Sequence, residues 1–580
     1  MALITGEGRY TGDLLPAGTA HMALVRSPYA HATVEAIDTS EAETADGVVL
    51  VLRPEDVVDI HGPPAPNPRR NIPPRSPLAQ GRVLMVGDPV VSVIAETPQQ
   101  ALDAAELVVV DYEPLPVAND PEEAIGAPAI HPDMQGNVAY ERKGGDPAEL
   151  AALAAATVVE GTIEHPRVVP SPLETRSVLA EWGDGALTVH LSSQAPHLMA
   201  EELAKALGMP QSSVRVVTPF VGGAFGCKFD LAEEEMLAVI AAQRCRRPVR
   251  WVESRREHIA VIGHGRAQRH HFRAIAGTDG RILGLWVDSI VDLGCRQRFL
   301  APVPSTPRIG TGPYDIAVYA WRQRGVYTNR APMGIYRGAG RPEATLTLER
   351  VIDRIAGELG LDPAEVRRVN LIGADRFPYA SAGGYTFDSG DYPRALDRLL
   401  ELSGYAELRR SQEQARQEGR YLGIGLGAYV EACGFEEWEA GRVTVHPDGS
   451  VTASAGTLDQ GQGHRTAFAQ IVAAELGLEA AQVRVEQGDT ASAPYGWGTS
   501  GSRSVAHGGS GVLGAARLVA AKLRRIAAHV LEAAPEDVVL SGGVAAVRGT
   551  DVSVAWEDLV GKAWSARQLP PGDEPGLEEE

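Results

Sequence analysis

The chain has 580 residues, of which 44% are hydrophobic and 22% are charged, and its formal net charge is -21. This length exceeds what one hydrophobic core supports and predicts roughly three or four domains. The strong negative charge disfavours nucleic acid and anionic membranes as general partners, because both need a positive protein surface.

The chain is poor in cysteine, with only Cys227, Cys245, Cys295 and Cys433 and no C-x-x-C pair. The spacing favours neither a zinc ribbon nor an iron–sulfur ligand set, and so few thiols are typical of a reducing compartment. No run approaches the ~18–20 apolar residues of a membrane span, and the first residues do not resemble a secretory signal. We therefore expect a cytoplasmic protein.

Residues 1–115 predict a first domain of α+β type. Its strands are expected at 21–26, 32–37, 90–95 and 108–112, and its helix at 97–107. The proline-rich residues 62–68 predict a loop inside this domain. The looser residues 116–157 predict a linker.

Residues 158–385 predict a second domain, in which strands and helices alternate. Its strands are expected at 187–191, 214–217 and 282–291, and its helices at 198–207, 232–243 and 344–359.

Residues 386–580 predict a third domain. Its strands are expected at 441–445 and 451–455, its helices at 466–476 and 512–533, and a strand entering a helix at 552–559. The charged, proline- and glycine-rich residues 569–580 predict either a frayed tail or a point at which a longer protein stops early.

Four glycine-rich loops carry the chemical signal. They are PMGIYRGAGRPE at 332–343, FVGGAFG at 220–226, DQGQG at 459–463 and GTSGSRS at 498–504. Glycine lets backbone amides approach a ligand closely, and Gln, Ser and Arg side chains donate hydrogen bonds. Any one loop could be a simple turn. Together they predict one large, polar, phosphate-bearing ligand.

Other motifs favour ordinary structural roles. Residues 509–514 match G-x-G-x-x-G, but a polar loop precedes them where a dinucleotide fold requires a strand. The start of that helix leaves two interpretations open, a phosphate site or a close helix contact. Cys227 has no paired base in the sequence, so a buried inert thiol is favoured over a nucleophile.

The histidines likewise lack metal-ligand spacing. His264, His270, His271, His464 and His507 form no H-x-x-x-H pair. Exposed or core histidines are therefore the favoured interpretation.

Five segments, in order, resemble the large molybdenum-binding subunit of the molybdenum hydroxylases, the family of xanthine dehydrogenase, aldehyde oxidase and aerobic carbon monoxide dehydrogenase. They are QAPH at 194–197, VGGAFG at 221–226, YRGAGR at 336–341, GQG at 461–463 and residues 498–504. The opening GEGRYTGD at 6–13 and VRSPYAH at 25–31 resemble the start of the family's hammerhead domain. The resemblance covers essentially the whole chain. It implies an α+β protein with an a/b hammerhead domain followed by two mixed α/β molybdopterin-binding domains, the last incomplete.

The resemblance implies molybdenum bound through molybdopterin cytosine dinucleotide, with no protein side chain as a metal ligand. Gln194 matches the glutamine beside the metal, and Arg337 matches a loop arginine that stabilises negative charge on substrate. The matched cofactor-binding residues are Gly223, Phe225, Gly226, Gly338, Gln460, Gly461, Gln462, Gly463, Thr499 and Ser502.

The implied assembly is a dimer of heterotrimers, with FAD on a medium subunit and [2Fe–2S] centres on a small subunit. The implied reaction hydroxylates an aldehyde or an N-heterocycle, with water as the oxygen source. The substrate itself is not readable from the sequence.

Two departures from the family pattern matter. Gly338 follows Arg337 where the carbon monoxide enzymes have a copper-binding cysteine, which disfavours that activity. The family's Gly-x-Gly-Glu segment, whose glutamate is the general base, does not occur, and the chain resembles a form truncated at its C-terminus. The alternative is therefore a non-catalytic fragment or split-gene half that binds cofactor and needs a separate C-terminal polypeptide.

Overall fold

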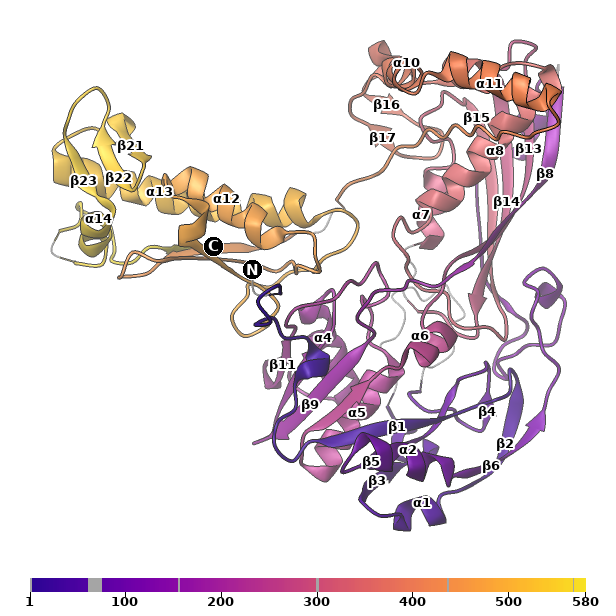
Figure 1. The fold of residues 1–580 in the computed structure, drawn as a ribbon, viewed down its shortest axis with the longest axis horizontal. Helices are drawn as coiled ribbons and strands as arrows, with labels where there is room; N and C mark the ends of the chain where they lie inside the picture. Colours follow the sequence, from indigo (N-terminus) through magenta and orange to yellow (C-terminus); the bar gives the residue numbers. More distant parts are fainter. Residues whose placement is uncertain (1–2, 61–75, 155–156, 299–301, 435–437, 567) are drawn as a thin grey trace.

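The computed structural model describes residues 3–60, 76–154, 157–298, 302–434, 438–566 and 568–580 (Figure 1). The loop predicted at 62–68 lies outside these residues. Among the helices that are described, none combines the length and apolar character needed to cross a bilayer.

A seven-stranded sheet joins the first and second predicted domains. Its order is β11 (Val214–Val217), β10 (Ala186–Leu191), β9 (Ser177–Gly183), β12 (Val249–Val252), β1 (Ala20–Arg26), β5 (Pro89–Ala95) and β3 (Val48–Leu52). The parallel pairing of β1 with β12 is the junction. Ala20 and Val249 lie 229 positions apart in the sequence and are partners in this pairing, which fixes the first predicted domain to the second.

Helices cover this sheet. The helix α2 (Pro98–Glu106) packs on β1 and β5, α4 (Pro196–Leu207) packs on β11, and α5 (Glu233–Cys245) packs on β9 and β12. The core includes Leu187, Leu203 and Leu237, each with none of its surface exposed. The short α1 (Ser40–Thr44) contacts β3, and a small sheet of β4 (Arg82–Val83), β2 (Ala32–Asp38) and β6 (Val109–Pro114) completes the N-terminal part.

A five-stranded sheet forms the other half of the second predicted domain. Its order is β7 (Val138–Gly144), β15 (Val318–Tyr327), β14 (Ile282–Gly294), β13 (Gly265–Ala276) and β8 (Thr157–Val168). The long α8 (Arg341–Leu359) packs on β8 and β13. Its buried Val351, Ile352 and Ile355 close the core.

Part of the predicted linker is folded into this sheet. Residues 138–144 form β7 and pair with β15 over six residue positions. Ala118, Ala124 and Ile130 are buried in the adjoining core. The domain boundaries remain a prediction, but this stretch is structural and does not act as a free connection.

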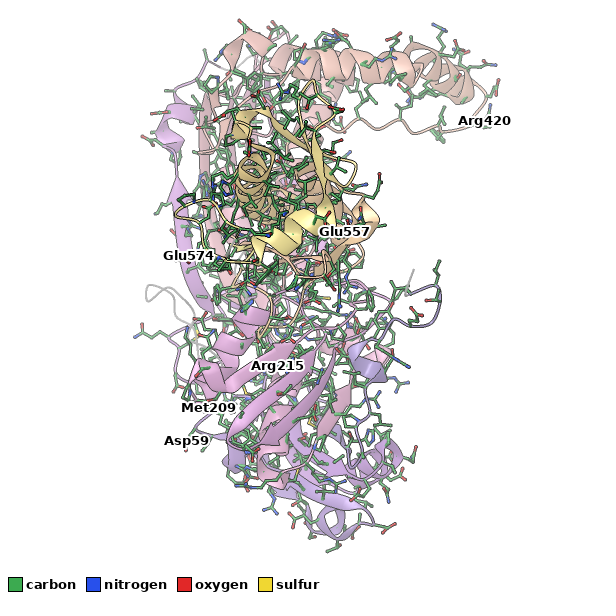
Figure 2. The ribbon with its side chains drawn as sticks, turned by 90° about the vertical axis from the view of Figure 1, so that its left-hand side faces the viewer. Asp59, Met209, Arg215, Arg420, Glu557 and Glu574 are labelled. Carbon is green, nitrogen blue, oxygen red and sulfur yellow. The ribbon has the colours of Figure 1, made fainter. Side chains whose placement is uncertain are left out.

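Shorter helices surround the two sheets. They are α3 (Pro147–Ala151), α6 (Arg255–Val261), α7 (Pro302–Arg308), α9 (Pro363–Asn370), α10 (Tyr392–Leu402) and α11 (Tyr405–Gln417), with a small ribbon of β16 (Tyr379–Ala380) and β17 (Thr386–Phe387). Arg420 lies at the far tip beyond α11 (Figure 2).

The third domain packs two long helices on a mixed sheet, in which β19 and β20 are parallel, and stands apart from the five-stranded sheet (Figure 1). The sheet order is β20 (Val483–Glu486), β19 (Val451–Ala455), β18 (Gly441–Val445) and β24 (Glu578–Glu579). The helices are α12 (His464–Leu476), α13 (Ser510–Leu531) and α14 (Trp556–Ala563), beside a second sheet of β21 (Val538–Ser541), β22 (Val544–Val547) and β23 (Ser553–Ala555).

The prediction of a frayed end is wrong. Leu577 is fully buried in the third-domain core, and β24 pairs with β18. Arg442 on β18 forms an ion pair of 2.6 Å with Glu580. The apolar side chain at 577 and the charges around it therefore bring the segment back to the sheet.

Candidate functional site

Gln194 connects the second and third domains. It lies between β10 and α4 and is only 4% exposed. Its Nε2 donates to the carbonyl of Thr499 at 2.9 Å. Its Oε1 accepts from the backbone amide of Gly226 at 2.8 Å. Both ends of the side-chain amide are thus fixed, one by each domain.

The glycine loop at 220–226 needs its glycines for space. Gly226 has a φ of 107°, and a Cβ there would lie 2.7 Å from both Cγ2 and the carbonyl oxygen of Ile335. Phe225 also has a positive φ, of 56°, and is 42% exposed. The carbonyl of Phe225 accepts from the backbone amide of Arg337 at 2.9 Å, so this loop and the arginine loop are in direct contact.

The arginine loop is held from behind. Arg266 donates to the carbonyl of Arg337 at 2.7 Å and to that of Tyr336 at 3.2 Å, and its guanidinium lies 4.9 Å from the Tyr336 ring centroid. Gly338 has a φ of 103°, and a Cβ there would meet Pro342 at 2.5 Å. Arg337 is exposed, and its guanidinium has no partner among the described residues. Its backbone is therefore fixed while its charge is available.

The loop at 459–463 is held mainly by its own residues. The amide of Gln460 donates to Oε1 of Gln462 at 2.6 Å, and Asp459 Oδ1 accepts from the amides of Gly461 at 2.9 Å and Gly463 at 3.3 Å. The Nε2 of Gln460 is buried and has no hydrogen-bond partner among the described residues. That unsatisfied donor is a group which a polar ligand would satisfy.

Residues 498–504 connect this loop to Gln194. Thr499 Oγ1 donates to the carbonyl of Leu458 at 2.6 Å and accepts from its amide at 2.9 Å. Ser502 is exposed and has a φ of 56°. Behind the loop, Arg503 pairs with the fully buried Glu439, and burial raises the pKa of Glu439 to about 7.

Further contacts dock the third domain on the edge of the seven-stranded sheet. Arg215 on β11, labelled in Figure 2, forms an ion pair of 2.5 Å with Asp489. The amide of Thr218 donates to the carbonyl of Gly488 at 2.7 Å. The rings of His197 and Tyr495 lie 4.9 Å apart. The two domains therefore present their glycine loops to one shared region.

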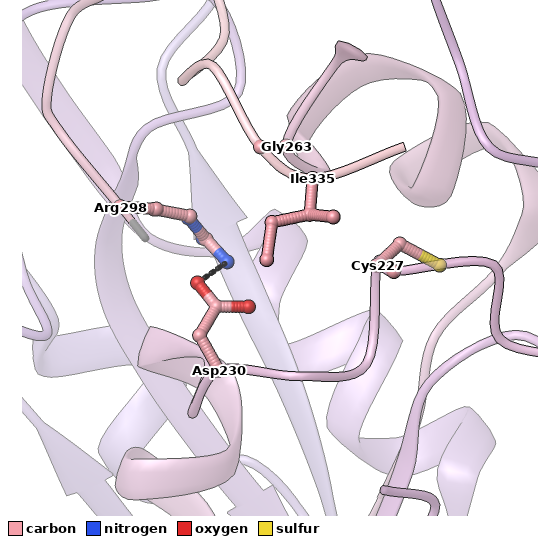
Figure 3. A pocket seen from close by; sticks show the side chains of 7 residues that line it. Cys227, Asp230, Gly263, Arg298 and Ile335 are labelled. Carbon is pink, nitrogen blue, oxygen red and sulfur yellow. Dashed lines mark ion pairs between the residues drawn. The ribbon is translucent and has the colours of Figure 1, made fainter. Parts of the chain in front are cut away.

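A small pocket lies behind Gly226 (Figure 3). It is lined by Gly226, Cys227, Asp230, Gly263, Arg298, Gly334 and Ile335. Arg298 and Asp230 form an ion pair of 3.6 Å across it. The Cys227 thiol donates to the carbonyl of Ala224 at 2.9 Å, and burial raises its pKa to about 12. Such a thiol is not a nucleophile near neutral pH.

No group of three or more His, Cys, Asp or Glu side chains within the described residues could hold a metal ion. His270 is buried and contacts Thr347 Oγ1 at 2.8 Å and Gln268 Oε1 at 2.9 Å. This contact set is that of a structural histidine. The helix at 510–531 continues from a helical turn at 504–509, and no strand leads into it.

The sequence did not identify Glu174, Lys228 or Arg266 as residues of this region. Lys228 follows the glycine loop by two positions and reads as an ordinary surface lysine, whereas its side chain is fully buried against Glu174. Arg266 has a left-handed backbone with a φ of 66°, and no residue pattern in the sequence predicts this conformation.

The residues fit a pterin cofactor without metal-ligating side chains. Close approach to the loops is permitted by glycine, the Gln460 amide lacks a partner, and the Arg337 charge is free to meet a ligand.

Three family descriptions match the chain. Residues 5–116 match the aldehyde oxidase and xanthine dehydrogenase a/b hammerhead domain, and residues 130–371 and 398–580 each match a molybdopterin cofactor-binding domain. The predicted α+β class and its order of domain types are confirmed.

Known proteins resemble the chain over nearly its full length. The carbon monoxide dehydrogenase large chain of Hydrogenophaga pseudoflava is 36% identical over 99% of this chain and 76% of its own length. The nicotine 6-hydroxylase large subunit of Paenarthrobacter nicotinovorans is 35% identical over 99% of this chain and 74% of its own. The crystal structure of quinoline 2-oxidoreductase from Pseudomonas putida 86 superposes with a TM-score of 0.94 at 32% identity, covering 100% of this chain and 77% of that one.

Proposed function

Because the chain belongs to the molybdenum-binding large subunits of the xanthine dehydrogenase and aldehyde oxidase family, we propose that it hydroxylates an aldehyde or an N-heterocycle with water as the oxygen source. Its class, a molybdopterin-dependent oxidoreductase, follows from that membership. The reaction and the cytosine dinucleotide form of the cofactor are the proposal.

The observation that carries the proposal is the position of Gln194. One side-chain amide donates to Thr499 and accepts from Gly226, so it links a loop of the second domain to a loop of the third. Such a residue can fix the two loops relative to each other, so that both contact one ligand. The match of Gln194 to the family's glutamine supports a position for it beside the metal.

We assign the remaining residues by chemistry. When bound, the molybdenum cofactor supplies two-electron redox chemistry and oxygen transfer. Gly223, Phe225 and Gly226 would line its site, and the residues that would hold the pterin and its phosphates are Gln460, Gly461, Gln462, Gly463, Thr499 and Ser502. Arg337, beside Gly338, stabilises negative charge that develops on a substrate oxygen, because its guanidinium is exposed and without a partner among the described residues.

One position argues against carbon monoxide as the substrate. Gly338 stands where a copper-binding cysteine would be needed for carbon monoxide oxidation, and a glycine cannot bind copper through a side chain. The proposal therefore favours an organic C–H substrate, although a carbon monoxide dehydrogenase large chain is among the similar proteins.

Electrons leave the site through partner subunits. The four cysteines are free and dispersed, with Cys227 and Cys295 buried, so we place the [2Fe–2S] centres on a small subunit and FAD on a medium subunit. A dimer of such heterotrimers is the proposed assembly.

The proposal assigns a general base to no residue of this chain, because the Gly-x-Gly-Glu segment does not occur in it. The alternative is a subunit that binds the cofactor alone, with the catalytic glutamate on a separate polypeptide. Adding such a polypeptide would then raise turnover without changing the molybdenum content.

The test is co-expression with the medium and small subunits. We expect about one molybdenum atom and one pterin per chain, cytosine nucleotide released on acid hydrolysis, and dye reduction with an aldehyde or an N-heterocycle. Bound molybdenum without turnover would favour the alternative. A chain that copurifies with its partners but holds neither molybdenum nor pterin would contradict both.

A further inference from the structure

Glu174 lies at the centre of a hydrogen-bond cluster next to Gln194 and the glycine loop at 220–226. Three donors converge on its Oε2: the backbone amide of Gly222 at 2.7 Å, Ser192 Oγ at 2.8 Å and Lys228 Nζ at 2.9 Å. Its other oxygen, Oε1, is buried and has no hydrogen-bond partner among the described residues. One carboxylate oxygen thus joins three segments of the chain.

Lys228 contributes more than its charge. Its side chain is fully buried beside Glu174. Its carbonyl accepts from the backbone amide of Gln194 at 2.9 Å, and its own amide donates to Gln194 Oε1 at 3.4 Å. Residue 228 therefore contacts Gln194 through both main-chain groups while its ammonium is fixed by Glu174.

The glycine loop is fixed to Glu174 in both directions. The amide of Glu174 donates to the carbonyl of Gly222 at 3.2 Å, and the amide of Gly222 donates back to the carboxylate. A Cβ at Gly222 would lie 2.6 Å from the Cβ of Glu174, so only glycine permits this approach. The loop enters the site at Gly222, held by Glu174, and leaves it at Lys228, held by the same side chain.

We propose that Glu174 and Lys228 are a positioning pair that fixes the glycine loop and the Gln194 amide in the geometry which receives the cofactor. Neither touches substrate or the reacting atoms. The pair acts through Gln194 and Gly226, and its part in cofactor binding rests on the function proposed above.

The charge on each partner makes the pair cooperative. A buried ammonium without its carboxylate is strongly disfavoured, and so is the reverse. Removing either charge should loosen the loop, whereas removing both should restore part of its order. Hydrogen bonds to a charged group are stronger than neutral ones, so their loss should be measurable at the amides they hold.

The experiment is hydrogen exchange on the chain in complex with its partner subunits, for Glu174→Gln, Lys228→Met and the double variant. We expect exchange in residues 220–228 to accelerate roughly tenfold in each single variant and less in the double variant, since about 1.4 kcal/mol corresponds to a factor of ten. Exchange in the distant strands β18 and β19 should not change. The matched control is the exposed pair Glu141 and Lys143, 3.3 Å apart on β7, changed in the same way.

Loss of folding in a charge variant would not remove the test. Ser192→Ala deletes one donor to Glu174 and keeps both charges, and it should accelerate exchange in residues 220–228 by roughly two- to fivefold. Wild-type exchange rates at 220–228 in folded Glu174→Gln or Ser192→Ala would overturn the proposal. So would an equal effect from the control pair.

Molybdenum content, measured on the same samples, separates this proposal from the proposed function. We expect a severalfold loss in each single charge variant. If the wild-type complex holds no molybdenum, the proposed function fails while the exchange data still decide the positioning pair. If the wild type is loaded and the variants exchange normally, only the positioning pair fails.

Discussion

The two sides of the site are built differently. On the second-domain side, Gln194, Gly226 and Lys228 are buried or half-buried and bonded to residues from distant segments. On the third-domain side, Gln462 and Gly461 are exposed, and their polar contacts are to Gln460 and Asp459 within the same loop.

The difference indicates separate roles. A wall fixed by long-range contacts can hold its geometry before any ligand arrives, which lowers the entropy cost of binding. A loop that bonds mainly to itself can exchange those bonds for bonds to a ligand. We infer that the second domain sets the position of the reacting end of the cofactor, while the third-domain loop adapts to the remainder.

The largest expected effect is on stability, and it should differ between alanine variants of two glycines with a similar positive φ. Gly226 has a φ of 107° and is crowded by Ile335, whereas Gly461 has a φ of 112° and nothing within 4 Å of its missing Cβ. Gly226→Ala should lower the free energy of unfolding by roughly 2–5 kcal/mol, through strain and overpacking. Gly461→Ala should cost less, about 1–2 kcal/mol, from backbone strain alone. Denaturant unfolding measures the free energy of unfolding of both variants. Equal losses would contradict the difference that we infer between the second-domain and third-domain loops.

A second comparison uses two glutamines. Gln194→Ala leaves the Gly226 amide and the Thr499 carbonyl without partners, so we expect a loss of roughly 2–3 kcal/mol. Gln462→Ala should change stability by less than about 0.5 kcal/mol, because the side chain is exposed. Both variants should lower the molybdenum content of the assembled complex. Unchanged metal content in Gln462→Ala would mean that this loop does not hold the cofactor.

Acidic pH should lower the folding stability of the second domain. Burial lowers the pKa of His131 and of His165 from an ordinary 6.5 to about 4. Between these values the unfolded chain binds the proton and the folded chain does not. Stability is therefore full above pH 6.5 and is lost as the pH falls toward 4, by roughly 1–3 kcal/mol per histidine.

Thermal melts between pH 7.5 and pH 4.5 measure this loss. His165→Gln should flatten the profile, whereas His529→Gln, at an exposed position on α13, should leave it unchanged. If the pH dependence of the melting temperature is the same in His165→Gln as in the wild type, protonation of His165 does not cause the loss of stability.

The smallest effect concerns a contact between the two sides. The guanidinium of Arg465 on α12 lies 4.5 Å from the ring centroid of Phe220, at the start of the glycine loop. Arg465→Ala should cost about 0.5–1 kcal/mol in unfolding experiments. Arg465→Lys should recover part of this free energy. A loss above roughly 2 kcal/mol in Arg465→Ala would show that this contact contributes more to the association of the two domains than we infer.

Regular local patterns made much of the fold predictable. The strands expected at 214–217, 441–445 and 451–455 match β11, β18 and β19 residue for residue, because their apolar side chains alternate. The long strand β13 was missed, since histidine and arginine side chains hide its alternation. The linker prediction missed β7 because its strand partner β15 lies about 180 residues further along the chain.

The site was predictable only where a motif marks it. Glycine loops and their glutamines are visible as residue patterns. Glu174 and Lys228 are 54 residues apart and become neighbours only through the fold. The sequence likewise gives no sign that Gln194 would bond to Thr499, 305 positions away.

Anomalous diffraction at the molybdenum edge, from crystals of the assembled complex, would test whether the loops of the second and third domains bind the molybdenum cofactor between them. We expect one strong peak per chain between the loops at 194–228 and 459–504, within reach of Gln194. A peak elsewhere on the chain, or none in crystals that contain all the subunits, would contradict this position for the cofactor.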